Sequence, residues 1–122
     1  MHYDPLFEPE PESWMQLDEQ ERIALVLKQH ARTGAELPNA MLHAAIHAVV
    51  ENQLAMNDNR VRHTLDRLLG EGLDRHDAIH AIGSVLAEQL WRMGRGAQVP
   101  PSSEGYYDSL TKLSAAKWRT AR

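Results

Sequence analysis

The spacing of apolar residues between helix-capping residues most constrains how this chain can fold. Apolar side chains recur every three or four positions in five segments, and no segment alternates apolar and polar residues as a half-buried strand does. We expect helices over residues 18–34, 38–57, 61–70 and 74–94, and a last one from Ser102 or Ser103 through Trp118. The sequence therefore predicts an all-α protein: a compact bundle of about five helices with an extended acidic N-terminal arm.

The chain is long enough for one core and acidic at its N-terminus. Its 122 residues fit a single helical domain over residues 14–122, preceded by an acidic Pro-rich arm over residues 1–13. The first 21 residues hold seven acidic residues and no Lys or Arg, whereas the remainder, with 13 basic and 10 acidic residues, carries +3. The arm either folds back on the basic end (Lys112, Lys117, Arg119 and Arg122) or stays solvated, and we favour the solvated arm. Trp14, Trp91 and Trp118 are expected to anchor the core.

Composition excludes several classes of function. The chain has no cysteine, so disulfides, zinc thiolates, iron–sulfur clusters and thiol nucleophiles are ruled out. No apolar run approaches the length of a membrane span, and the N-terminus lacks the features of a signal peptide, so we expect a cytoplasmic protein without a membrane partner. No stretch forms a dense basic face, so there is no strong nucleic-acid signal.

Histidines at helical spacing form the candidate site. His43, His47 and Glu51 lie four residues apart in one expected helix, and His76 and His80 repeat this spacing in another. A step of four residues stays on one face of a helix, so each set forms a stripe. Small neighbouring residues allow the two helices to approach closely, and His30 can add a further nitrogen. The sequence predicts a divalent transition metal (Zn, Fe or Mn) held by the following residues: His43, His47, Glu51, His76 and His80.

Two other interpretations stay open beside metal binding. The histidines can be buried and hydrogen-bonded in a structural or protein-interaction module that has no metal. Alternatively, the run from Arg75 to His80 (an Arg, a polar residue, three further positions, then a His) resembles the motif of HEPN ribonucleases. That resemblance implies a metal-independent RNA-cleaving homodimer in which His80 transfers protons and Arg75 stabilises the phosphorane-like charge. If the protein is a metal enzyme, we expect metal-assisted hydrolysis at an open coordination position.

A longer pattern resembles a family of small, uncharacterised bacterial helical proteins, a domain of unknown function that in some relatives accompanies a SEC-C-type module. The resemblance covers most of residues 14–119. It is carried by Trp14, Leu17-Asp18-Glu19, Glu21-Arg22-Ile23, Leu37-Pro38-Asn39, His43, His47, Glu51-Asn52-Gln53 and the run from Gly72 to Gly83. It implies an α-helical domain of bacterial, cytoplasmic origin and no particular activity. The cysteines of a SEC-C module do not occur in this chain.

Overall fold

The computed structural model describes residues 2–32, 39–94 and 103–121, and these residues form helices without any strand. The prediction of an all-α protein is confirmed. The expected helix end at residue 34, the expected helix start at residue 38 and the alternative start of the last helix at Ser102 lie outside the described residues. The helices are α1 (Pro11–Gln16), α2 (Glu19–Arg32), α3 (Ala40–Ala55), α4 (Asn59–Gly70), α5 (Arg75–Gly94), α6 (Ser103–Lys112) and α7 (Ala115–Ala121).

The helices begin where local capping residues predict. Asp18 and Glu21 form a capping box, because the Glu21 backbone N–H donates to Asp18 Oδ1 at 2.8 Å and the Asp18 N–H donates to Glu21 Oε1 at 3.1 Å. The Asn39 side chain caps α3, and Asp74 accepts a hydrogen bond from the backbone of Asp77 at the start of α5. These caps satisfy backbone N–H groups that the first turn leaves without a helical partner.

The structure differs from the sequence prediction in two helices. The short helix α1 was not predicted, because six residues are too few for apolar periodicity to be visible. Its signals are Pro11 at the first helical position and Glu10 as the cap, whose carboxylate accepts from the Ser13 N–H. The predicted last helix is divided into α6 and α7. Ser114 separates them, since its hydroxyl caps α7 by accepting from the Lys117 N–H at 3.1 Å.

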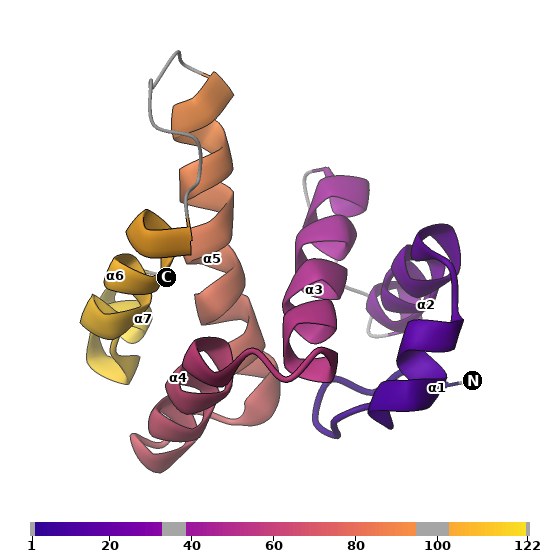
Figure 1. Cartoon of the computed structure of the whole chain (residues 1–122), viewed down its shortest axis with the longest axis horizontal. Helices are drawn as coiled ribbons and strands as arrows, with labels where there is room; N and C mark the ends of the chain where they lie inside the picture. Colours follow the sequence, from indigo (N-terminus) through magenta and orange to yellow (C-terminus); the bar gives the residue numbers. More distant parts are fainter. Residues whose placement is uncertain (1, 33–38, 95–102, 122) are drawn as a thin grey trace.

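Helix α3 lies between α2 and α5 and joins two apolar cores (Figure 1). One core contains Trp14 and buried residues of α2 and α3, and the other is formed by α3, α4, α5 and α6. Of the three expected tryptophan anchors, Trp14 is fully buried and Trp118 packs partly buried on the second core. The expectation is wrong for Trp91, which is 61% exposed near the end of α5.

The N-terminal segment packs against the bundle, so the expectation of a solvated arm is wrong. Tyr3 is only 2% exposed, although residues 2–10 form no helix. Glu8 pairs with Arg62 of α4 at 2.6 Å, and Arg75 of α5 donates a hydrogen bond to the Pro5 carbonyl at 2.9 Å. Burial of apolar surface together with these charge-assisted contacts offsets the entropy lost when the segment is ordered.

Asp58 is expected to stabilise the junction of α4 and α6 by about 1–2 kcal/mol. Its Oδ1 caps α4 by accepting from the N–H groups of Arg60 and Val61, and its Oδ2 accepts from the Tyr107 hydroxyl. Urea unfolding of Asp58→Ala measures the sum of both contacts, and Tyr107→Phe removes only the second. The exposed Asp66→Ala on the same helix is the matched control. An equal loss in the control variant would contradict this role of Asp58.

Candidate metal centre

Five histidines from three helices meet between the two cores. His30 comes from α2, His43 and His47 from α3, and His76 and His80 from α5. One ring nitrogen from each of His30, His47, His76 and His80 lies within 4.8 Å of the others. His43 adjoins this group, since its Nε2 lies 3.1 Å from His80 Nε2 and its ring centroid 4.9 Å from that of His30.

Helices α3 and α5 run antiparallel (Figure 1), so the histidine stripe of α3 lies beside the histidine stripe of α5. Because the helices run in opposite directions, His43 meets His80, His47 stacks on His76 with ring centroids 5.9 Å apart, and Glu51 meets Arg75. Small residues let the helices approach closely. A Cβ added at Gly83 of α5 would lie 3.2 Å from the Ile46 side chain of α3, which is tighter than an ordinary contact.

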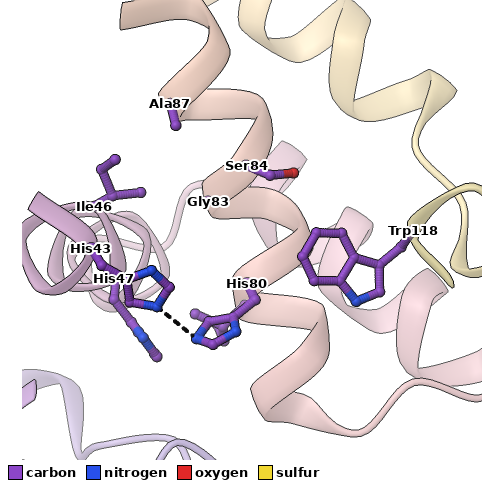
Figure 2. A pocket seen from close by; sticks show the side chains of 9 residues that line it. His43, Ile46, His47, His80, Gly83, Ser84, Ala87 and Trp118 are labelled. Atoms are coloured by element: carbon purple, nitrogen blue, oxygen red, sulfur yellow. Dashed lines mark hydrogen bonds between the residues drawn. The ribbon is translucent and has the colours of Figure 1, made fainter. Parts of the chain in front are cut away.

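Two imidazole nitrogens approach the same ring nitrogen of His80. His80 Nε2 lies 3.1 Å from the Nε2 atoms of both His43 and His76, and Figure 2 shows the first of these contacts. A neutral ring nitrogen carries either a proton or one lone pair, so it cannot be the donor to one neighbour and the acceptor from the other. The spacing is also close to that of neighbouring ligands on one metal, because zinc–nitrogen bonds place them about 2.9 Å apart at a right angle and about 3.3 Å apart at the tetrahedral angle.

Glu51 is engaged in a buried ion pair beside the histidines. It is 1% exposed, and its two carboxylate oxygens accept from Arg75 Nη2 at 2.7 Å and Nη1 at 2.8 Å. Its Oε2 also accepts from the Tyr3 hydroxyl at 2.5 Å. Burial alone would lower the pKa of Arg75, but the hydrogen bonds and negative charge of Glu51 outweigh it and raise that pKa. Arg75 therefore stays charged and forms a two-bond ion pair with the Glu51 carboxylate.

This ion pair determines how His47 is protonated. The Tyr3 hydroxyl donates a hydrogen bond to the carboxylate of Glu51, so the Tyr3 oxygen accepts a hydrogen bond from His47 Nε2 at 2.7 Å. Burial and the charge of Glu51 raise the pKa of Tyr3, which keeps the phenol protonated. With its proton on Nε2, His47 carries a lone pair on Nδ1. That nitrogen is buried and has no hydrogen-bond partner in the part of the chain that the structure describes.

Three of the five histidines have lowered pKa values, which favours the neutral form in which imidazole binds metals. Burial, together with the neighbouring His43 and His76, lowers the pKa of His30 to about 4. Burial also lowers the pKa of His43, with a further contribution from His76. The pKa of His47 lies well below its ordinary value because the ring is buried and would face four other imidazoles if it were charged. At neutral pH these rings offer lone pairs rather than positive charge.

The structure brings most of the sequence-predicted ligands together. His47, His76 and His80 belong to the four-nitrogen group, and His43 contacts it directly. His30, considered from the sequence as a further nitrogen, is the fourth member. Both oxygens of Glu51 contact Arg75. Sequence reasoning missed Tyr3, because it lies 44 residues from His47 and no local pattern connects the two.

Fold and site together define an all-α protein with a cluster of five histidines, of which His30 and His47 are buried. The chain belongs to a family described as a domain of unknown function (DUF1841), whose model matches residues 5–112 and so includes all five histidines. No curated protein and no solved structure matches the chain. None of the helices in the described residues is long and apolar enough to cross a membrane.

Proposed function

We propose that this protein binds a divalent transition metal through His30, His47, His76 and His80, with His43 next to the ion. The observation that carries the proposal is that one nitrogen of each of the four rings lies within 4.8 Å of the others. These rings come from three helices, so a bound ion would join α2, α3 and α5. Imidazole suits zinc and iron, whereas manganese prefers oxygen ligands, so zinc is the first metal to test and iron the second.

Two further observations support a ligand in this cluster. The buried Nδ1 of His47 has no partner among the described residues, and a buried lone pair of this kind costs stability unless something binds it. On the Nε2 side of the ring, the Tyr3 hydroxyl, itself bonded to Glu51, orients His47. In metal sites, carboxylates and other hydrogen-bond acceptors orient histidine ligands in the same way. We therefore infer that His47 offers Nδ1 to the metal.

The other interpretations receive less support. A purely structural network would have to satisfy the buried nitrogens among themselves. The two contacts at His80 Nε2, and a His47 Nδ1 that has no hydrogen-bond partner among the described residues, disfavour such a network. A HEPN-like ribonuclease needs the Arg75 guanidinium to face a phosphate. That guanidinium is 9% exposed and bonded to Glu51 and to the Pro5 carbonyl.

Elemental analysis and zinc titration of protein purified without an affinity tag test the proposal. We expect about one zinc or iron per chain in the wild type, and binding weakened at least a hundredfold in His76→Ala and in His80→Ala. Both histidines are partly exposed, so these variants are expected to fold, and circular dichroism checks this. The matched control is His63→Ala, an exposed histidine on α4, which should bind zinc like the wild type.

Two results would overturn metal binding at this cluster. One is a wild-type protein that contains no metal and takes up neither zinc, iron nor manganese after reconstitution. The other is undiminished zinc binding in folded His76→Ala and His80→Ala proteins. In either case the histidines would be structural, and RNA cleavage that resists chelators and is lost in His80→Ala would then favour the ribonuclease interpretation.

A further inference from the structure

A pocket of about 270 Å³ adjoins the histidine cluster between α3 and α5. Figure 2 shows His43 and His80 directed toward each other at one side of it, and Trp118 of α7 pointing toward α5. The remainder of the wall is mostly apolar and comes from Ile46, Ile79, Gly83 and Ala87. The volume lies near the lower end of the range of ligand pockets, so it fits a molecule with about one ring.

Among the described residues, the side chains that line the pocket include no carboxylate that could balance the charge of a metal ion. The four nitrogens of the proposed site belong to imidazole rings, which carry no negative charge. The nearby Glu51 is already neutralised by Arg75, with both oxygens bonded to the guanidinium. A divalent ion held by these rings would keep its two positive charges in a mostly buried setting, where a counter-charge is strongly favoured. An anionic ligand group would supply that charge.

The remainder of the pocket favours an apolar body on this ligand. The Ser84 hydroxyl in the wall already donates a hydrogen bond to the Ala81 carbonyl at 2.7 Å. Ile46, Ile79 and Ala87 offer only carbon, and Trp118 offers an aromatic ring. A ligand with several polar groups would lose hydrogen bonds to water on entering, whereas an aromatic or branched alkyl body would gain from burial.

We propose that this pocket binds a small aryl or branched-alkyl carboxylate, with the carboxylate as a fifth ligand on the metal ion and the apolar body between Ile46, Ile79 and Trp118. The inference rests on the proposed metal site, since the ion provides the charge that selects the carboxylate. His43 lies at the pocket wall beside His80 and can donate a hydrogen bond to the second carboxylate oxygen.

Calorimetric titration of the zinc-loaded protein with benzoate tests this inference. Acetate has the same charged group without the body, and benzyl alcohol has a similar body without the charge. We expect benzoate to bind at least tenfold more tightly than either, and at least tenfold more tightly to the zinc-loaded than to the metal-free protein. Ala87→Phe fills the pocket from α5 and should weaken benzoate at least tenfold while the zinc affinity stays within about twofold. Ala116→Phe, at an exposed position of α7, is the matched control.

The outcomes separate this inference from the metal site itself. If zinc does not bind, the proposed function and this inference both fail. Two results would overturn the pocket inference and leave the metal site intact. In one, zinc binds but benzoate binds no more tightly than acetate. In the other, zinc binds but Ala87→Phe leaves the benzoate affinity unchanged. Equal benzoate binding with and without zinc would likewise overturn the contact between carboxylate and metal.

Discussion

Replacing Glu51 with alanine is expected to lower the free energy of unfolding by about 3–5 kcal/mol. The change leaves the guanidinium of Arg75 buried without its anionic partner. In the wild type, Glu51 accepts hydrogen bonds from both terminal nitrogens of Arg75, at 2.7 and 2.8 Å. It also removes the acceptor of the Tyr3 hydroxyl and so weakens the contact that holds the N-terminal segment on the bundle. Urea unfolding followed by circular dichroism measures the loss.

A double variant distinguishes the destabilisation caused by the unpaired charge from that caused by lost packing. Removing both charges in Glu51→Met with Arg75→Met should recover most of the lost stability, since an apolar pair of similar volume leaves no unpaired ion. The control for a surface pair is Glu104→Ala, whose contact with Arg60 is 3.4 Å long between side chains that are 75% and 58% exposed. That variant should change stability little. A loss below about 1 kcal/mol in Glu51→Ala would contradict a structural role for the pair.

Zinc is expected to raise the stability of the wild type by about 4 kcal/mol when its free concentration is a thousand times the dissociation constant. For a chain of 122 residues this corresponds to an increase in melting temperature of roughly 12–24 °C. The gain follows because the four rings come together only when α2, α3 and α5 are packed, so the folded state binds the ion and the unfolded chain binds it weakly. Thermal unfolding in a zinc buffer and in a chelator measures the difference.

The same melting experiment in variants tests whether the stabilisation comes from the histidine cluster. His80→Ala should abolish most of the zinc-dependent increase, and His63→Ala should keep it. Magnesium at the same concentration should have no effect, because this cation prefers oxygen ligands and octahedral geometry. An equal increase in His80→Ala and in the wild type would show that zinc acts elsewhere on the chain.

Local signals were sufficient to predict the main helices. The capping box of Asp18 and Glu21 and the cap at Asp74 depend on residues within one turn of each other, and the structure contains both. The two failures also have local causes. Helix α1 is shorter than two turns, and the apolar pattern continues across the break that Ser114 makes between α6 and α7.

The candidate site was predictable only in part, because its chemistry depends on distances between helices. The spacing of four residues fixed that His43, His47 and Glu51 share one face, and that His76 and His80 share another. It did not fix what each side chain faces across the interface. Glu51 meets Arg75 because α3 and α5 run antiparallel, so the last member of one stripe lies opposite the first turn of the other helix.

The sequence by itself determined the all-α class, most helix ends and the two stripes, because these depend on residues a few positions apart. Only the tertiary structure decided that His30 joins the other histidines and that Tyr3 reaches His47 across 44 residues of chain. It also decided that Glu51 contacts Arg75. The physical reason is that the ligand set and the ion pair depend on how closely helices far apart in the chain approach, and two separate cores fix that approach.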